Sequence, residues 1–316
     1  MRFGLRCLLL GLCLCATAAS VRAAPAVVIV SSDASAAYAE AVQALVGELV
    51  QGGLAPADVQ RMTAAEFAAA PLPPSMSTPK LFIALGAQAA LALARAQPQL
   101  PAPVLCALLP RSAFERVLQL SGRKASAQFS GLVLDQPLGR QLSLVRLALP
   151  QTTHLGVLLG PESKALAPTL AGLAVARGFN VVEANVDQNE PVFTGLRQVL
   201  EGAQVLLALP DPAVFNANSL QNILLTSFRA RVPVVAFSPA YVRAGALLAL
   251  YATPAQTGQQ AGELALGVLR GRALPAQPIE PRVFSISVNA HVARSLDLTL
   301  DADRLTQELS RSEARP

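Results

Sequence analysis

Polar side chains that could hold a small molecule stand directly after several short apolar runs of this 316-residue chain. Such runs are typical of buried strands, and the ligands of parallel sheets bind beyond the carboxyl ends of the strands. Two groups follow runs in the first half of the chain, and three single residues follow later runs: Ser31, Ser32 and Asp33; Gly86, Ala87 and Gln88; Asp211, Ser238 and Tyr241. We expect these nine residues to line one ligand-binding site.

Each of these positions has a structural alternative beside its binding role. Residues 31–33 could cap the helix that follows them. Residues 86–88 open a predicted helix, whose free amides suit a carboxylate, but Gly86 could simply permit a tight turn. Asp211 stands between two prolines and could be a turn residue. Tyr241 could stack on a ligand or pack its ring in the core.

Residues for catalysis or metal binding do not form a pattern in this sequence. It has no Gly-x-Ser-x-Gly elbow, no Gly-x-x-x-x-Gly-Lys loop and no Gly-x-Gly-x-x-Gly turn after the first strand. The two histidines, His154 and His291, have no metal-ligand partner at a suitable spacing. Asp33, Asp135 and Asp211 are the main carboxylates near predicted strand ends, and their spacing indicates no acid–base pair. We expect no catalytic residue, no metal and no cofactor.

The elements that must position the binding residues alternate between apolar strands and longer amphipathic helices. We predict strands over residues 26–30, 59–62, 80–85, 103–109, 128–134, 154–159, 180–184, 205–209, 232–237, 245–251 and 282–288. We predict helices over residues 35–50, 87–95, 112–119, 138–149, 165–177, 191–200, 219–229, 254–269 and 301–316. Because most strands are apolar throughout, they indicate parallel sheets covered on both faces.

This rhythm of strands and helices runs twice along the chain. The fold class is therefore α/β, with two doubly wound parallel-sheet lobes. The expected boundaries are residues 25–135 plus 253–285 for the first lobe, residues 136–252 for the second, and residues 286–316 for a C-terminal hinge strand, helix and tail. About 290 residues remain after the leader described next, which suits two domains.

Residues 1–24 have the anatomy of a secretory signal peptide. Two arginines precede an apolar run over residues 7–15, and small residues follow it. The run is shorter than the ~20 residues that span a bilayer. A leucine rather than a small residue precedes Cys13 and Cys15, which disfavours a lipoprotein. We expect an exported, periplasmic protein with no membrane span in the mature chain.

The net charge argues against a nucleic-acid-binding protein, and the cysteine content predicts one buried thiol. The net charge is +5, and three arginines leave with the leader, which brings it to about +2. The remaining basic residues are scattered, so nucleic-acid binding has no electrostatic support. Cys106 is the one cysteine after the leader, and its apolar surroundings predict a thiol in the core.

The most specific motifs lie in the second half of the chain. Phe-Ser-Pro-Ala-Tyr-Val at 237–242 and Gly-Ala-Leu at 245–247 fall within the stretch 211–261, and a further motif covers 284–298. Weaker motifs are Ala-Leu-Gly-Ala-Gln-Ala-Ala at 84–90 and Ser-Gly at 130–131. With these motifs, residues 27–298 resemble the ABC-transporter substrate-binding family related to tryptophan- and tyrosine-type binding proteins. The resemblance implies a periplasmic binding protein type I fold with a multi-strand hinge, and an inner-membrane ABC permease as partner.

Two departures from the family pattern concern the ligand. Gly86-Ala87 stands where the family often has Gly-Thr, so a hydroxyl is missing from the expected carboxylate site, and the chain has few aromatic residues. Both points argue against an aromatic amino acid. The sequence predicts a non-enzymatic periplasmic solute-binding protein of an ABC-type uptake system, which holds a small molecule, such as an amino acid or related compound, between its lobes. The alternatives are a ligand-binding accessory to a membrane sensor or outer-membrane uptake system, and, less favoured, an exported enzyme.

Overall fold

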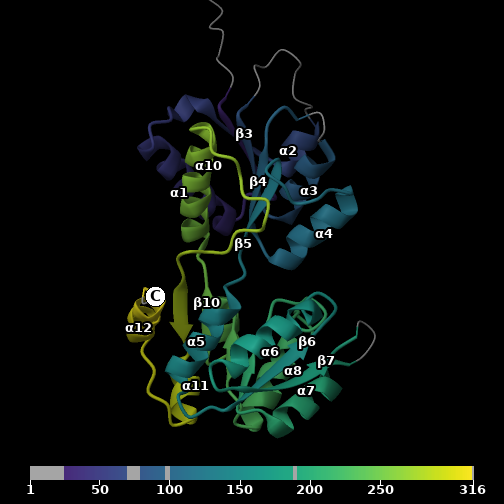
Figure 1. Ribbon diagram of the computed structural model, residues 1–316, viewed down its shortest axis with the longest axis vertical. Coiled ribbons are helices and arrows are strands. Elements are labelled where there is room, and N and C mark those ends of the chain that lie inside the picture. Colours follow the sequence, from purple (N-terminus) through teal and green to yellow (C-terminus); the bar gives the residue numbers. More distant parts are fainter. Residues whose placement is uncertain (1–24, 70–78, 97–99, 188–190, 315–316) are drawn as a thin grey trace, which may run out of the picture.

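The structure, a computed structural model, describes residues 25–69, 79–96, 100–187 and 191–314. Strands and helices alternate along this chain and form two separate β-sheets with helices on both faces. Figure 1 shows the sheets in two lobes that follow one another along the long axis. The predicted α/β class with two parallel-sheet lobes is confirmed. The predicted signal peptide, residues 1–24, lies outside the described residues.

The first lobe is built on a parallel sheet in the order β2-β1-β3-β4-β5. Its strands are β1 (Val27–Ser31), β2 (Val59–Thr63), β3 (Leu81–Leu85), β4 (Val104–Leu109) and β5 (Phe129–Val133). Its helices are α1 (Ala36–Gln51), α2 (Ala64–Ala69), α3 (Ala87–Ala96), α4 (Arg111–Ser121) and α10 (Pro254–Leu269), with the 3-10 turn η1 (Pro56–Asp58). Alternate strand residues belong to two buried clusters: Val28 packs with α3, and Val27 packs with α1 and α10. Both faces of the sheet are covered, which is why its strands are apolar throughout.

The second lobe has a sheet in the order β11-β10-β9-β8-β6-β7, parallel except where β11 pairs antiparallel with β10. Its strands are β6 (His154–Leu159), β7 (Asn180–Asn185), β8 (Val205–Leu207), β9 (Val234–Ala236), β10 (Leu248–Tyr251) and β11 (Ser285–Val288). Its helices are α5 (Leu138–Ala148), α6 (Ala167–Val175), α7 (Val192–Gly202), α8 (Leu220–Arg229), α9 (Pro239–Ala244), α11 (Ala290–Ser295) and α12 (Ala302–Glu313), with the 3-10 turn η2 (Lys164–Leu166). Leu305 and Leu309 of α12 are part of the buried cluster on one face of this sheet.

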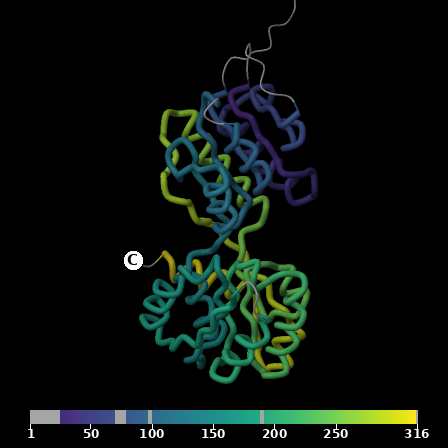
Figure 2. The backbone as a smooth tube through the Cα atoms, turned by 90° about the vertical axis from the view of Figure 1, so that its right-hand side faces the viewer, coloured from purple at the N-terminus to yellow at the C-terminus, as the bar shows by residue number. Residues whose placement is uncertain are grey.

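Within the described residues the chain passes between the lobes three times. It crosses after β5, after β10, and again between α10 and β11. The third crossing lies beside the first, because Ile279 N donates to Gly131 O at 2.7 Å and Ile279 O accepts from Val133 N at 2.9 Å. Figure 2 shows these strands of chain as a narrow waist between two wider bodies.

Helix α10 returns from the second lobe and completes the first. Pro254 is its first residue, and Thr253 and Gln256 form a reciprocal capping box at its start. It packs closely on α1, because Gly258 lets the two backbones approach: a Cβ at this position would collide with Ala41 O. The predicted bounds of this helix, 254–269, are confirmed.

Three six-residue helices, α2, α9 and α11, were not expected from the sequence. The strand predicted over 245–251 is shorter, because α9 runs to Ala244 and Gly245, with φ of +126°, ends it. Cys106 is fully buried in β4, which confirms the predicted core thiol. Residues 285–313 belong to the second lobe through β11 and α12. The exact lobe boundaries stay a prediction.

No helix in the described part of the chain has both the length and the apolar character to cross a membrane.

Candidate functional site

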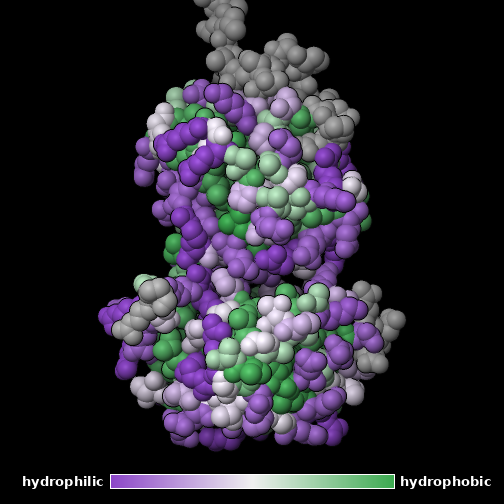
Figure 3. Space-filling view, in the orientation of Figure 1, coloured by the Kyte–Doolittle hydropathy of each residue, from purple (hydrophilic) through white to green (hydrophobic). Residues whose placement is uncertain are grey.

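A cavity of about 490 Å³ lies between the two lobes. Its walls come from the ends of β4 and β5 in the first lobe, the ends of β8 and β9 in the second, and the crossing after β10. The lining residues are Pro110, Ser112, Leu134, Asp135, Gln136, Gln141, Pro210, Asp211, Pro212, Phe215, Phe237, Ser238, Pro239, Tyr241, Leu250, Tyr251, Ala252 and Pro254. Figure 3 shows that the molecular surface narrows between the lobes. A site in this position contacts both lobes at once.

Three aromatic rings form one wall of the cavity. The ring centroid of Tyr241 lies 4.9 Å from that of Phe237 and 6.4 Å from that of Phe215. Helix α9 positions the tyrosine, since Ser238 is its N-cap and accepts from Ala240 N at 3.3 Å. The Tyr241 hydroxyl donates to Phe215 O at 3.4 Å, and burial raises the pKa of the phenol. This wall can stack on an apolar or aromatic ligand.

Asp135 brings a carboxylate to the first-lobe side of the cavity. Its Oδ2 accepts from Arg111 N at 2.6 Å, at the start of α4. No other described residue donates a hydrogen bond to Oδ1. Burial raises the pKa of this carboxyl, and the Arg111 amide and guanidinium offset part of that effect. Asp135 can therefore accept a hydrogen bond from a ligand.

Gln136 and Gln141 lie beside Asp135 and are both buried. Gln136 Oε1 accepts from Arg140 Nη1 at 2.9 Å, and its backbone carbonyl accepts from Gln141 Nε2 at 2.7 Å. Gln136 Nε2 is buried and has no hydrogen-bond partner among the described residues. A buried amide without an acceptor is rare in folded proteins, and it marks this corner of the cavity as polar.

Asp211 lines the opposite wall, but its carboxylate is occupied by the protein. Oδ2 accepts from Glu162 N at 3.0 Å, Ser163 N at 2.8 Å and Ser163 Oγ at 2.8 Å. Oδ1 accepts from Ala213 N at 3.0 Å. Gly160 leaves room for the carboxyl group, because a Cβ there would lie 2.5 Å from it. These bonds join the loop after β6 to the loop after β8 and so fix the second-lobe wall.

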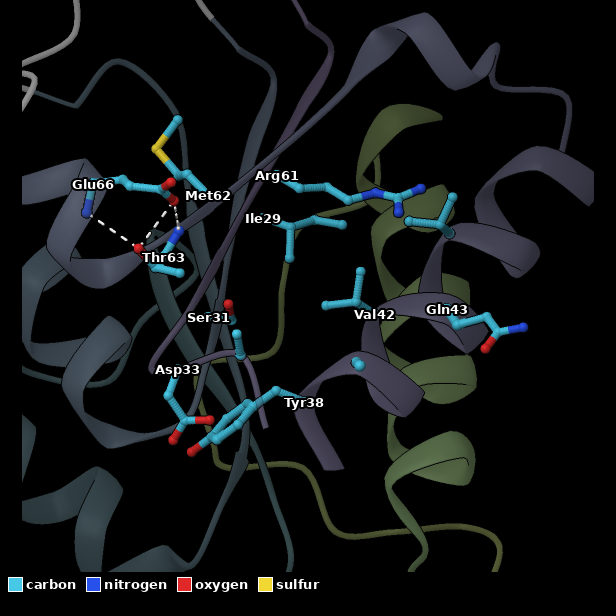
Figure 4. A pocket seen from close by; sticks show the side chains of 13 residues that line it. Ile29, Ser31, Asp33, Tyr38, Val42, Gln43, Arg61, Met62, Thr63 and Glu66 are labelled. Atoms are coloured by element: carbon cyan, nitrogen blue, oxygen red, sulfur yellow. Dashed lines mark hydrogen bonds between the residues drawn. The ribbon is translucent and has the colours of Figure 1, made fainter. Parts of the chain in front are cut away.

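The structure places Ser31 and Asp33 away from this cavity. Both line a separate pocket of about 570 Å³ between β1, β2 and α1. Figure 4 shows Asp33 and Tyr38 near the end of β1, and Thr63 and Glu66 joined by hydrogen bonds on another side. Asp33 Oδ1 accepts from Ser35 N at 2.7 Å in a turn just before α1. Ser35 is the N-cap of that helix and no side-chain hydrogen bond caps it, so Asp33 has a structural role in the turn but not the predicted capping role. A ligand contact of these two residues stays a prediction.

Ser32 and Gly86 hold the ends of β1 and β3 together. Ser32 Oγ donates to Leu85 O at 3.0 Å and accepts from Ala89 N at 3.1 Å in the first turn of α3. Gly86 has φ of +86°, and a Cβ there would collide with Tyr38 Oη and Ser32 Oγ. Ala87 and Gln88 are exposed on the first turn of α3. The cavity thus brings together Asp211, Ser238 and Tyr241, but none of the six predicted residues of the first lobe.

An ion pair also joins the lobes beside the cavity. The Arg116 guanidinium, on α4, contacts Glu162 of the second lobe. The arginine side chain is 59% exposed, so water screens the pair strongly. The other carboxylate oxygen of Glu162, Oε2, is buried and has no hydrogen-bond partner among the described residues.

Metal-ligating side chains do not gather in the described part of the chain. No group of three or more His, Cys, Asp or Glu side chains in the described chain could hold a metal ion. His154 Nδ1 lies 3.0 Å from Thr153 Oγ1, and His291 Nδ1 lies 3.0 Å from Arg294 Nη2. Burial raises the pKa of the Cys106 thiol, which keeps it protonated. The arrangement is suited to binding a small molecule.

Comparisons with known proteins concern the family and the fold of the chain. A family described as ABC transporter substrate binding protein matches residues 75–309. The chain is similar to a tyrosine-binding protein of Clostridioides difficile (strain R20291), with 24% identity over 196 residues, or 60% of this chain. The match spans 56% of that relative's length.

Solved structures share the fold. A ligand-free, open substrate-binding protein with adhesive properties from Clostridium difficile has a TM-score of 0.66 and 20% identity, covering 88% of this chain and 96% of that one. An ABC domain in complex with L-Trp from Streptococcus pneumonia has a TM-score of 0.60 and 16% identity, covering 90% and 98%. The expected periplasmic binding protein type I fold is confirmed.

Proposed function

The chain belongs to the ABC transporter substrate-binding protein family, and from this premise we propose that it captures one small solute between its lobes and delivers it to an ABC permease. The family is non-catalytic, and we propose the same for this chain. With the predicted leader, the proposed place of action is the periplasm. The match to the family supports the permease as partner.

The observation that carries the proposal is the cavity bounded by both lobes. Its volume of about 490 Å³ falls in the range of small-molecule sites, roughly 300–1,000 Å³. A ligand that contacts both walls gains contacts when the lobes approach, so it stabilises a closed form. The three chain crossings supply the hinge for that motion.

We propose that Ser238 and Tyr241 hold the solute from the second lobe, while Asp211 fixes the wall behind it. Residue 31 ends β1, and residues 32–33 and 86–88 follow β1 and β3, which belong to the same parallel sheet as β4 and β5. They would reach the solute when the lobes close.

The test is a thermal-shift and calorimetric screen of the chain from residue 25 onward. The library contains amino acids, amines, sugars, nucleosides and small organic acids. A true ligand at a hundred times its dissociation constant stabilises the fold by about 2.7 kcal/mol. Saturable binding of one chemical class supports the proposal, and silence across the library overturns it.

A matched pair of variants locates the site. Tyr241→Ala removes an aromatic ring of the cavity and should weaken binding at least tenfold. Phe193→Ala removes a ring of which 51% is exposed on α7, outside the cavity, and should leave affinity unchanged. Equal effects of both variants would place the ligand elsewhere.

A further inference from the structure

The charges around the cavity indicate which class of solute it takes. Its ionisable side chains are Asp135, Asp211 and two tyrosines. No lysine, arginine or histidine is among the described lining residues, although the chain has 25 Lys and Arg against 20 Asp and Glu. A wall without cationic side chains gives no ion pair to a carboxylate or phosphate.

Asp135 is the carboxylate that remains available. Asp211 already accepts four hydrogen bonds from the protein, as described above, whereas Asp135 Oδ1 has no donor from another described residue. The nearby Arg111 guanidinium does not fully neutralise the negative charge of Asp135, because it also pairs with Glu280 at 3.2 Å. Glu115 adds a further carboxyl close to Asp135. The first-lobe side of the cavity therefore attracts a cation.

Burial raises the pKa of Asp135, which means that the loss of water around the ionised form outweighs the stabilisation that Arg111 gives it. A ligand ammonium beside Oδ1 would add a further stabilising partner. The energetic gain is larger in a closed cleft than in water, because the charges interact in a medium of lower dielectric constant.

The carboxylate of an amino acid would meet only neutral donors on the Asp135 side of the cavity, such as the unpaired Gln136 Nε2. At the start of α3, the expected place for it, Ala89 N already donates to Ser32 Oγ, which itself donates to Leu85 O. Ala87 contributes no hydroxyl there. Asp33 follows β1 at the same edge of the sheet and would repel a second carboxylate.

The opposite wall suits an apolar body with a positive end. Phe215, Phe237 and Tyr241 present rings within 4.9 to 6.4 Å of one another. Aromatic faces attract cations as well as apolar groups. Asp135 and this ring cluster line the same cavity from opposite lobes.

We propose that the solute is an organic amine without a carboxylate, with its ammonium group on Asp135 and its apolar body against Phe215, Phe237 and Tyr241. This inference rests on the proposed function, since it names the ligand class of the same cavity. It separates the chain from relatives whose names specify amino acids.

The test compares ligands that differ only in the carboxylate. Isothermal titration at pH 7 of the chain from residue 25 onward measures phenethylamine against phenylalanine, tyramine against tyrosine, and isopentylamine against leucine. We expect each amine that binds to do so at least tenfold more tightly than its amino acid. This comparison needs no variant, so a misfolded protein cannot mimic the result.

A charge-matched pair of variants then tests the contact. Asp135→Asn should weaken amine binding at least tenfold, whereas Glu183→Gln, which removes an exposed carboxylate of β7, should not change it. An amino acid that binds as tightly as its amine overturns the inference but keeps solute binding. Unchanged amine binding by Asp135→Asn, or no amine binding at all, also overturns it. Silence of every solute class overturns the proposed function as well.

Discussion

At Asp135, the ionised carboxylate that is proposed to bind the ligand lowers the stability of the ligand-free fold. Its pKa is raised by burial from the usual 3.8, so the carboxyl of the unfolded chain ionises at lower pH than that of the folded chain. The free energy of unfolding therefore falls as pH rises between the two pKa values and stays lower above them.

Asp135→Asn should remove this penalty in the ligand-free protein. The asparagine Oδ1 can still accept from Arg111 N, so the start of α4 keeps its partner. We expect a Tm at pH 7 equal to or above that of the parent chain, and no difference near pH 3, measured by differential scanning calorimetry. A clear drop in Tm at pH 7 would mean that the carboxylate is structural.

Asp211 should behave in the opposite way. Asp211→Asn places an amide NH2 among donors that now point at Oδ2, which leaves Ser163 N or Glu162 N without an acceptor. A buried donor left unpaired costs about 1–3 kcal/mol, which urea unfolding would detect. Asp297→Asn is the control, because Asp297 is exposed and its φ of +61° is well tolerated by asparagine. Equal stability of both variants would contradict the wall-fixing role of Asp211.

At the scale of elements, the close contact between α1 and α10 depends on a glycine. Gly258→Ala forces a Cβ against the backbone at Ala41, which the helices relieve only by moving apart. We expect a loss of about 1–3 kcal/mol in urea unfolding, the usual cost of overpacking. Gly47→Ala, in the same helix pair, meets no atom within 4 Å and should stabilise α1 by up to about 1 kcal/mol. Loss of stability in both variants would point to a general intolerance of the pair.

Local sequence patterns predict where the helices and strands lie along the chain better than they predict which elements become neighbours in space. Pro254 after Thr253 marks the start of α10, and apolar strands covered on both faces give the parallel sheets. The six-residue helix α9 was missed, because so short a helix shows less than two turns of periodicity. Its start, Ser238-Pro239, follows the strand predicted over 232–237 and is a typical N-cap followed by proline.

The sequence predicts the second-lobe residues of the candidate site but not those of the first lobe, because local patterns do not give the order of the strands. The rule that ligands bind at the carboxyl ends of strands finds the right edge of each sheet, and Asp211, Ser238 and Tyr241 do line the cavity. It cannot say which strand lies nearest the other lobe, since that depends on the strand order. β4 and β5 supply Pro110 and Asp135 to the cavity, whereas β1 and β3 supply nothing in this structure. Asp135 follows a predicted strand, as the nine predicted site residues do, but nothing in the sequence singled it out as a ligand contact.

Lobe separation is a property of the whole molecule, and the Arg116–Glu162 pair stabilises the separation seen here. Arg116→Gln removes that contribution, so closing around a ligand becomes less costly. An exposed pair contributes at most about 1 kcal/mol, so we expect ligand affinity to rise by no more than about fivefold. Titration calorimetry at low salt measures the gain, and small-angle scattering with saturating ligand should show a smaller radius of gyration. A fall in affinity would assign the pair to the closed form.

The return of the chain to both lobes also fixes the order in which they can be finished. The first lobe lacks a helix over one face until α10 has been synthesised, and the second lacks α12 until residue 313. A nascent chain emerging from the ribosome therefore keeps one face of each sheet incompletely covered until its last sixty or so residues follow. If the predicted leader directs an unfolded chain across the cytoplasmic membrane, this late completion delays folding until translocation is nearly over.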